Sequence, residues 1–315
     1  MLKISSLALK AAAVLSCSLS LSVAAHASAQ VFESVNDFGA NPGALTASIY
    51  TPATNPGSAL VVLLHGCVQD GIELADNSGL TGLAQEKQFA VLVPQQSFDN
   101  NVKRCFNWFS AQDTQADSGE MLSLKNMITR AQASTGAKRV YLVGLSAGGA
   151  MASAALVNYP DLFSAGAVIA GLPYPCADNL TKAISCMKKG PAESIEELVS
   201  FAHKLHPEQA HWPTLSIWTG TTDAVVHPQN AQSLAAQWVQ LSGMETAPRV
   251  EQSTDYRISR WTDANGLLRV ALVEINNMGH GIAVNPEINN GGKEGDFLLK
   301  APIGSMDEII RSWGL

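Results

Sequence analysis

The chain has 315 residues, 46% of them hydrophobic, and a formal net charge of −7 at pH 7. Residues 1–29 include Lys3 and Lys10 but no acidic residue, so without them two positive charges are lost and −7 becomes −9. A face that binds nucleic acid must be basic, so this charge argues against nucleic acid as a partner. The remaining length suits one α/β domain with a sizeable buried core.

The pattern of residues 1–29 predicts a signal peptide. Positive charge comes before an apolar stretch rich in Leu, Ala, Val and Ser, and residues 25–27 and 27–29 both fit the small-residue cleavage pattern. Because serines interrupt the stretch and it ends at a cleavage site, we expect no retained membrane anchor. Ser16-Cys17 resembles a lipoprotein acylation site only faintly. The sequence therefore predicts export to the periplasm or the medium.

Short, β-branched apolar runs alternate with helix-like stretches along the rest of the chain. This alternation predicts a mostly parallel central sheet with helices on both faces, in a single domain over residues 30–315. The predicted strands are residues 60–64, 89–93, 139–144, 165–170, 215–218 and 269–275. The predicted helices are residues 79–87, 119–134, 147–158, 230–241 and 306–313.

Two segments depart from the alternation. Residues 256–261 and 267–273 are predicted to form an antiparallel hairpin, because the Asn265-Gly266 pair between them accepts positive φ. Residues 173–213 contain prolines, cysteines, a lysine pair and a helix-like stretch at 193–204. We expect this segment to be a small cap-like insertion over the site.

Four cysteines follow the predicted signal peptide, and export would place them in an oxidising compartment. An even number of cysteines there favours two disulfides. Cys176 and Cys186 lie close together in one loop-like region and would close a small ring, with Cys67 and Cys105 as the second pair. The alternative is four buried free thiols.

A glycine-flanked serine follows the strand predicted over residues 139–144. Gly144, Ser146 and Gly148 form a Gly-x-Ser-x-Gly pattern between that strand and a helix of small residues, which is the arrangement of a nucleophile elbow. Nearly side-chain-free neighbours allow a turn so tight that the serine hydroxyl is exposed at the edge of the sheet. We expect Ser146 to be a nucleophile; the alternative is a glycine-rich turn without chemistry.

A serine nucleophile needs a base, and the base needs an orienting carboxylate. In the α/β-hydrolase fold, which the elbow indicates, these residues follow in the order Ser, Asp or Glu, His. Asp223 lies a few residues beyond the strand predicted at 215–218, where loops of a parallel sheet gather at its carboxyl edge. We expect Asp223 to be this carboxylate, with a turn aspartate as the alternative. Asp255 and Asp263 are weaker candidates because they fall in or beside the predicted hairpin.

His280 lies just past the strand predicted at 269–275 and is flanked by two glycines. The glycines let the imidazole swing over the site, so we expect His280 to be the general base. His227 follows Asp223 too closely to complete the same triad and is expected at the rim of the site.

Three other histidines, His203, His206 and His211, are spaced as solvated residues of the candidate cap. A zinc site built from them would lack cysteine or carboxylate partners at the usual spacing. We therefore expect no metal, and acyl transfer by a serine triad needs no organic cofactor.

The tetrahedral intermediate of acyl transfer carries an oxyanion, which needs two preorganised donors. Ala147 follows the nucleophile directly and offers one backbone N–H. His65-Gly66 ends an early predicted strand where this fold usually places the second donor, so we assign it to the backbone N–H of Cys67. The alternative is that His65-Gly66 only terminates the strand. Cys67 is a poor candidate nucleophile because Ser146 already has the elbow.

Six motifs taken together are more specific than the elbow alone. They are Leu64-His65-Gly66-Cys67 with Gln69, Arg104-Cys105-Phe106-Asn107-Trp108-Phe109, Gly144-Leu145-Ser146-Ala147-Gly148-Gly149, Pro173-Tyr174-Pro175-Cys176 with Ser185-Cys186-Met187, Trp218-Thr219-Gly220-Thr221-Thr222-Asp223 and Met278-Gly279-His280-Gly281. With these motifs, residues 60–315 resemble the polyhydroxybutyrate depolymerase type of esterase, which overlaps with feruloyl and acetylxylan esterases.

The resemblance implies the same catalytic roles for Ser146, Asp223 and His280, and an ester of a short 3-hydroxy acid as substrate. It implies that Trp108 lines the cleft, and we expect Trp108 and His65 to bind substrate. Without the family, Trp108 is simply an aromatic core residue. Secreted members often add a linker and a polymer-binding domain that this sequence lacks, so we expect soluble oligomers, amorphous polymer or a plant-wall ester to be attacked.

Three other functions share some of these features. Feruloyl or acetyl groups on xylan would need the same machinery, and so would the amide bonds of polyaspartate, although a charge of −9 argues against a polyanion. A hydrolase fold that only binds its partner usually lacks a member of the triad, whereas all three candidates are present here in order.

Overall fold

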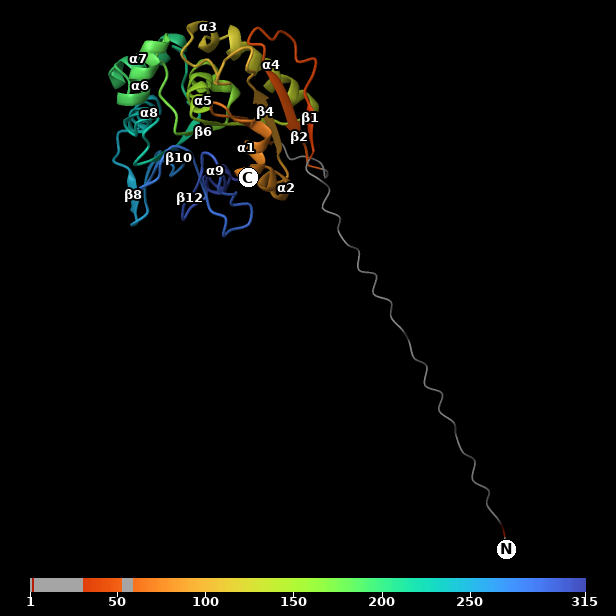
Figure 1. The fold of residues 1–315 in the computed structure, drawn as a ribbon. Coiled ribbons are helices and arrows are strands. Elements are labelled where there is room, and N and C mark those ends of the chain that lie inside the picture. The colour runs from red at the N-terminus through yellow and green to blue at the C-terminus, as the bar shows by residue number, and fades with distance from the viewer. Residues whose placement is uncertain (1, 3–30, 53–58) are drawn as a thin grey trace. The chain divides into compact units, whose positions relative to one another are not determined.

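The computed structural model describes residue 2, residues 31–52 and residues 59–315 (Figure 1). The predicted signal peptide, residues 1–29, lies outside the described residues apart from Leu2. Within the described part of the chain, no helix is long and apolar enough to cross a membrane.

A large mixed sheet forms the centre of the fold (Figure 1). The strands are β1 (Phe32–Ser34), β2 (Thr46–Tyr50), β3 (Ala59–Leu64), β4 (Ala90–Gln95), β5 (Arg139–Leu145), β6 (Ala165–Ile169), β7 (Thr214–Gly220), β8 (Arg249–Gln252), β9 (Tyr256–Thr262), β10 (Leu268–Ile275), β11 (Ile282–Val284) and β12 (Leu298–Lys300). The order in this sheet is β1-β2-β4-β3-β5-β6-β7-β10-β9-β8, and β11 pairs with β12 separately. From β4 to β10 each pair of neighbours is parallel, whereas the pairs at both ends are antiparallel.

The central strands are apolar throughout because both of their faces are buried. In β3, Leu60, Val62 and Leu64 pack into the core on one face of the sheet. Val61 and Leu63 pack into the core on the other face. A strand of this kind lacks the alternation of a half-exposed strand, which explains the uninterrupted runs in the sequence.

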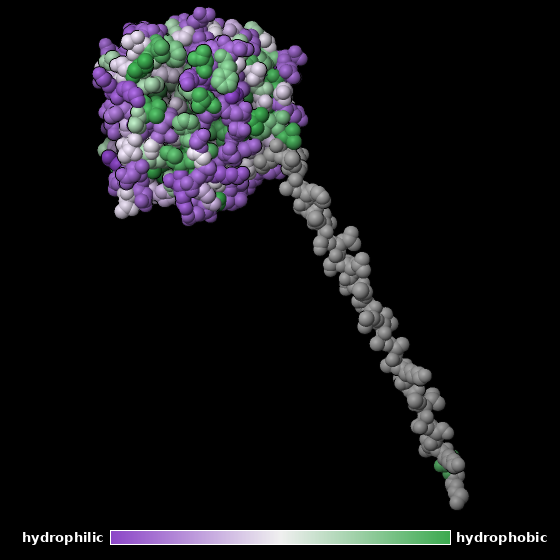
Figure 2. All heavy atoms as spheres, viewed as in Figure 1, coloured by the Kyte–Doolittle hydropathy of each residue, from purple (hydrophilic) through white to green (hydrophobic). Residues whose placement is uncertain are grey.

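Helices cover both faces of the sheet. They are α1 (Gly71–Asn77), α2 (Leu80–Lys87), α3 (Ala111–Thr114), α4 (Gly119–Thr135), α5 (Ala147–Asn158), α6 (Leu180–Lys189), α7 (Ile195–Leu205), α8 (Gln229–Leu241) and α9 (Ser305–Ser312). Side chains of α4, α5 and α8 pack on one face, and those of α1, α2 and α9 pack on the other. On the face seen in Figure 2, hydrophilic residues predominate and hydrophobic residues form patches between them.

The predicted elements of the parallel sheet are confirmed, with boundaries that differ by one or two residues. The hairpin is confirmed as β9 and β10, which pair antiparallel around a turn with Gly266 at φ +78°. The segment at 173–213 forms two helices where we expected one, because α6 precedes α7. Both predicted disulfides are present, Cys67–Cys105 and Cys176–Cys186.

Candidate active site

Ser146 lies on a strained turn between β5 and α5. Its backbone has φ 57° and ψ −118°, a combination that few residues other than glycine adopt. A Cβ atom at Gly144 would collide with the carbonyl oxygen of Gly148, and one at Gly148 would collide with that of Leu64. The glycines flanking the serine are therefore required by the close packing of β5, α5 and β3.

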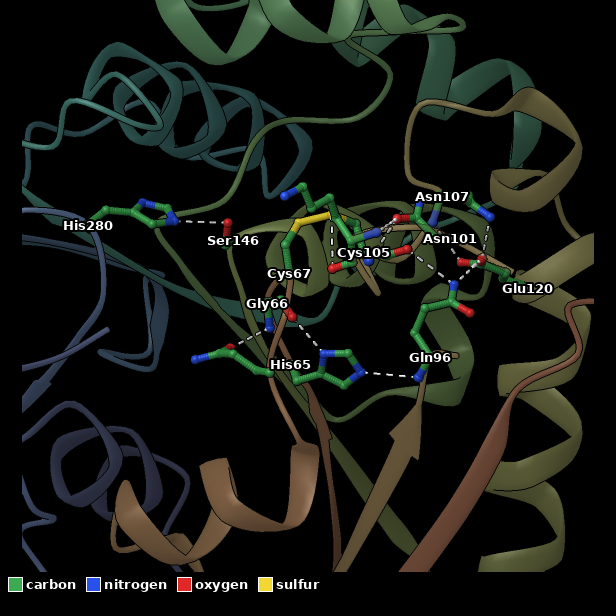
Figure 3. The surroundings of a disulfide bond; sticks show 12 residues. His65, Gly66, Cys67, Gln96, Asn101, Cys105, Asn107, Glu120, Ser146 and His280 are labelled. Carbon is green, nitrogen blue, oxygen red and sulfur yellow. Dashed lines mark hydrogen bonds between the residues drawn. A yellow bond between two sulfur atoms is a disulfide. The ribbon is translucent and has the colours of Figure 1, made fainter. Parts of the chain in front are cut away.

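The side chain of Ser146 belongs to a chain of short hydrogen bonds. Ser146 Oγ lies 2.9 Å from His280 Nε2, and His280 Nδ1 lies 2.7 Å from Asp223 Oδ2 (Figure 3 shows the first of these contacts). Asp223 Oδ1 accepts hydrogen bonds from the backbone N–H groups of Val225 and Val226, at 2.8 and 2.9 Å. With Nδ1–H donating to the carboxylate, Nε2 is left to accept the serine proton.

Neighbouring strands bring Asp223 and His280 together although 57 residues separate them. Asp223 follows β7 and His280 follows β10, and these two strands are parallel neighbours. The loops are tied to each other, since the N–H of Thr222 donates to the carbonyl of Met278 at 3.0 Å. The carboxyl edge of the sheet thus holds all three side chains.

The turn after β3 lies against the serine. A Cβ atom at Gly66 would lie 3.4 Å from Ser146 Cβ, and the N–H of Gly66 donates to Gln69 Oε1 at 2.7 Å. Among the described residues, neither the N–H of Cys67 nor that of Ala147 has a hydrogen-bond partner. Both residues line the cavity beside Ser146, so both N–H groups are free for a ligand.

His65 differs from the expectation that it binds substrate. Its side chain is fully buried and is absent from the cavity wall. Nδ1 donates to the carbonyl of Gly66 at 2.6 Å, while Nε2 accepts from the N–H of Gln96 at 3.1 Å. Burial lowers the pKa of His65 to about 4, which keeps the ring neutral. The side chain therefore stabilises the turn and does not reach the cavity.

A largely apolar cavity of about 270 Å³ opens beside Ser146. Trp108 lines it and is also part of the hydrophobic core, so its two expected roles coexist. Sequence reasoning placed none of five other wall residues at the cavity, because they come from loops and helices that meet only in the folded chain. They are Leu172, Met187, Val225, Val226 and Phe297.

A second, more polar cavity of about 380 Å³ adjoins the first. The two share Val68, Gln69 and Phe297 as walls. The remaining wall of the second cavity carries four carboxylates and one ammonium group, from Asp70, Glu73, Glu294, Asp296 and Lys293. An anionic group would be repelled there.

The other candidate residues lie elsewhere. His203 and His206 pack edge-on against Trp212, with ring centroids 6.0 and 6.2 Å away. Asp263 caps its own hairpin turn by accepting from the N–H of Asn265 at 2.9 Å. No group of three or more His, Cys, Asp or Glu side chains is placed to hold a metal ion in the described part of the chain.

Comparison with known proteins identifies the family of the chain. The family model described as esterase PHB depolymerase matches residues 45–259. Poly(3-hydroxyalkanoate) depolymerase C of Paucimonas lemoignei is 35% identical over 288 residues, which cover 89% of this chain and 69% of that protein. Acetylxylan esterase A of Aspergillus ficuum is 29% identical over 260 residues, which cover 76% of this chain and 84% of that protein.

Solved structures share the fold. The acetyl xylan esterase from Aspergillus awamori superposes with a TM-score of 0.71 and 24% sequence identity, over 79% of this chain and 94% of that one. At this level of identity the likeness concerns the fold alone. The match of the family model and the identity to the curated relatives show that the chain belongs to the esterase PHB depolymerase family of carboxylic ester hydrolases.

Proposed function

We propose that the protein is an exported serine esterase that hydrolyses polyhydroxybutyrate or its 3-hydroxybutyrate oligomers. The observation that carries the proposal is the hydrogen-bonded chain from Ser146 through His280 to Asp223, which opens into an apolar cavity. Membership of the esterase PHB depolymerase family and the likeness to a poly(3-hydroxyalkanoate) depolymerase support the choice of ester.

In the first half of the reaction Ser146 is the nucleophile. His280 Nε2 takes the hydroxyl proton as Oγ attacks the ester carbonyl, and Asp223 stabilises the imidazolium that forms. The backbone N–H groups of Cys67 and Ala147 donate to the oxyanion of the tetrahedral intermediate. His280 then gives its proton to the departing alkoxide, which leaves an acyl group on Ser146.

In the second half water replaces the alcohol. His280 removes a proton from a water molecule, which attacks the acyl-enzyme carbonyl through the same oxyanion site. Collapse of this intermediate releases the acid and returns the proton to Ser146. No step needs a metal or an organic cofactor.

The cavity favours a short acyl group. Its walls include aliphatic side chains, among them Leu172, Val225 and Val226, and a volume of about 270 Å³ suits a small ligand group. A 3-hydroxybutyryl unit is short, uncharged and largely aliphatic. The second cavity beside it would accept the alcohol side of a longer substrate.

Acetyl or feruloyl esters of plant-wall polysaccharides are the second candidate substrates. This alternative is favoured by the match to acetylxylan esterase A over 84% of that protein, and an acetyl group also fits the cavity. Polyaspartate is disfavoured as a substrate because it is a polyanion. Without residues 1–29 the formal net charge of the chain changes from −7 to −9, and the second cavity is rich in carboxylates.

Export is supported by two observations. Residues 1–29 have the pattern of a signal peptide, and both disulfides require an oxidising compartment to persist. The chemistry is the same whether the protein stays in the periplasm or enters the medium.

The test is acid release by the purified protein from four substrates, which are soluble 3-hydroxybutyrate oligomers, amorphous polyhydroxybutyrate, methyl ferulate and acetylated xylan. We expect selective release of 3-hydroxybutyrate, and a loss of roughly a million-fold in kcat for Ser146→Ala in a protein that remains folded. Activity confined to the ferulate or xylan would assign the protein to the plant-wall esterases. Undiminished turnover by Ser146→Ala would refute the nucleophile.

A further inference from the structure

A buried carboxylate outside the proposed triad lies near the turn at residues 65–68, which carries the proposed oxyanion donor of Cys67 and is called the oxyanion turn below. Glu120 is in the first turn of α4 and is fully buried (Figure 3). Its only charged neighbour among the described residues is Asp113, whose Oδ1 accepts from the N–H of Glu120 at 3.3 Å. No cation pairs with Glu120 in the described part of the chain, so hydrogen bonds alone must stabilise the buried carboxyl group.

The partners of Glu120 are N–H donors from one loop. Oε2 accepts from the backbone N–H of Asn107 at 2.8 Å, and Oε1 accepts from the side-chain amide of Asn107 at 2.8 Å. Oε1 also accepts from Gln96 Nε2 at 2.5 Å and from Asn100 Nδ2 at 3.3 Å. Every one of these partners lies between β4 and α3, in a loop without regular structure of its own. Glu120 therefore ties together three residues of the loop at 96–108.

This loop is joined directly to the oxyanion turn. Gln96 Nε2, which donates to Glu120, also donates to the carbonyl of Cys105 at 3.2 Å. Cys105 is bonded through its disulfide to Cys67, and the N–H of Val68 donates to the carbonyl of Lys103 at 2.7 Å. Figure 3 shows Glu120, Gln96 and Asn107 on one side of the disulfide and Ser146 on the other.

The same loop also supplies a wall of the cavity. Trp108, which follows Asn107, lines the cavity next to Ser146. Fixing the backbone of Asn107 through Glu120 therefore fixes the start of this wall. Burial raises the pKa of Glu120 to about 8, although the donors of Asn107 and Gln96 act to lower it. Burial thus opposes the charged form of Glu120, whereas the N–H donors around both of its oxygens favour it.

We propose that Glu120 is a positioning residue for acyl transfer: it holds residues 96–108, and through the Cys67–Cys105 disulfide it holds the oxyanion donor of Cys67 in place. The proposal rests on the proposed serine esterase mechanism. This role requires no contact between Glu120 and substrate. The influence of Glu120 reaches Cys67 through hydrogen bonds and the Cys67–Cys105 disulfide. Preorganised donors matter more in the transition state than in substrate binding, so kcat is the quantity that Glu120 controls.

The experiment compares Glu120→Gln with Ser123→Ala in the full protein, using p-nitrophenyl butyrate as substrate. Ser123 lies in the same helix and is equally buried, but its hydroxyl accepts from the N–H of Gly43 and donates to the carbonyl of Gly119. It makes no direct hydrogen bond to residues 96–108, and its link to them runs only through Gly43, whose carbonyl accepts from Asn100. In Glu120→Gln an amide NH₂ replaces one acceptor oxygen among N–H donors. We expect kcat to fall about 10-fold with KM within about twofold of the wild type. Ser123→Ala is expected to keep the wild-type kcat.

Asn107→Ala is a second variant in case Glu120→Gln does not fold, since it removes one donor and leaves the backbone N–H of Asn107 in place. It should show the same loss in kcat at unchanged KM. Combining Glu120→Gln with Cys67→Ala/Cys105→Ala should cost less than the product of the separate losses, because both act on one structure.

Three results would overturn the proposal: an unchanged kcat in folded Glu120→Gln, an equal loss in Ser123→Ala, or losses that multiply independently with those of the disulfide variant. If the wild type hydrolyses p-nitrophenyl butyrate but releases no 3-hydroxybutyrate from the oligomers or the polymer, the polyester substrate is refuted. The test of Glu120 still stands in that case. A wild-type protein inactive on all esters would refute the serine esterase function itself.

Discussion

Two histidines at the same edge of the sheet are placed in opposite environments. His280 reaches Ser146 with one ring nitrogen and a carboxylate with the other. His65 uses both nitrogens on the backbone and on a side-chain amide, and burial lowers its pKa to about 4. The first ring is placed for the proton transfers of the proposed mechanism, whereas the second fixes the turn that follows it.

Because the ring of His65 is buried in its neutral form, we expect the protein to lose stability in acid. Below the usual histidine pKa of 6.5 the unfolded chain binds a proton that the folded chain does not bind until about pH 4. The free energy of unfolding therefore falls as the pH decreases through this window, by about 3 kcal/mol for this group. Urea unfolding at pH 7.5 and pH 4.5 measures the loss.

His65→Gln should lose less stability than the wild type over the same interval. His211→Gln removes an exposed imidazole and is the matched control, expected to keep the wild-type loss. An identical loss in wild type and His65→Gln would show that other groups cause the acid sensitivity.

The role of a residue could be predicted when the residues that indicate it lie close by in the sequence. Ser146 is marked by glycines two positions away on either side, and Asp223 and His280 by the ends of strands and by their order in the chain. The role of His65 depends on Gln95 and Gln96, which are about 30 residues distant, so the sequence suggested a substrate contact instead. Glu120 gave no signal, because nothing near it in sequence shows the loop that it organises.

At the scale of elements, the junction of β5, α5 and β3 determines the position of the proposed nucleophile. Gly148 is in the first turn of α5, where the helix passes against the carbonyl groups of Leu64 and His65. The backbone of β3 and the helix approach each other closely only because Gly148 has no side chain.

At this junction we expect Gly148→Ala to destabilise the protein, although helix propensity alone would predict the opposite. Alanine is favoured over glycine in a helix by up to about 1 kcal/mol, yet the Cβ atom of Gly148→Ala would collide with two backbone oxygens. We expect a lower melting temperature and a large loss of activity, measured by thermal unfolding and by p-nitrophenyl butyrate hydrolysis.

Gly295→Ala is the control, because its Cβ atom would lie 3.9 Å from its nearest neighbour, Leu298. It should unfold and react like the wild type. A stabilised and active Gly148→Ala would mean that β3 and α5 can separate without displacing Ser146.

Elements that are buried on both sides could be predicted from the sequence, whereas partly exposed elements were predicted less well. The uninterrupted apolar runs of β3 and β5 and the small residues of α5 indicate their structure directly. α6 was not predicted, since its short amphipathic sequence lies among prolines and cysteines that indicate a loop. β1 and β8 were missed because they are largely exposed and gain their pairing from neighbours far away in sequence.

At the scale of the whole molecule, the two disulfides have different surroundings. Cys67–Cys105 closes a separation of 38 residues and joins the turn that carries the proposed oxyanion donor to the loop around Glu120. Cys176–Cys186 closes a separation of 10 residues and joins the start of the 173–213 segment to α6. The first therefore connects parts of the proposed catalytic apparatus, and the second lies within the 173–213 segment.

These surroundings predict distinct effects of removing each bond. In the chain-entropy estimate the longer loop contributes about 4 kcal/mol to stability and the shorter about 3 kcal/mol. Cys67→Ala/Cys105→Ala should lose stability and kcat together, whereas Cys176→Ala/Cys186→Ala should lose mainly stability. Denaturant unfolding and steady-state kinetics on both pairs check this. Four titratable thiols in the unreduced, denatured wild type would contradict both bonds.

Part of the cavity wall comes from segments of the chain that carry no proposed catalytic group. Met187 belongs to α6, Phe297 precedes β12, and Trp108 comes from the loop before α3. Substitutions at these wall positions would change the space open to the acyl group while the sheet edge that carries Ser146 and His280 stays in place. We therefore expect them to shift the preference among esters more than the breaking of the ester bond itself.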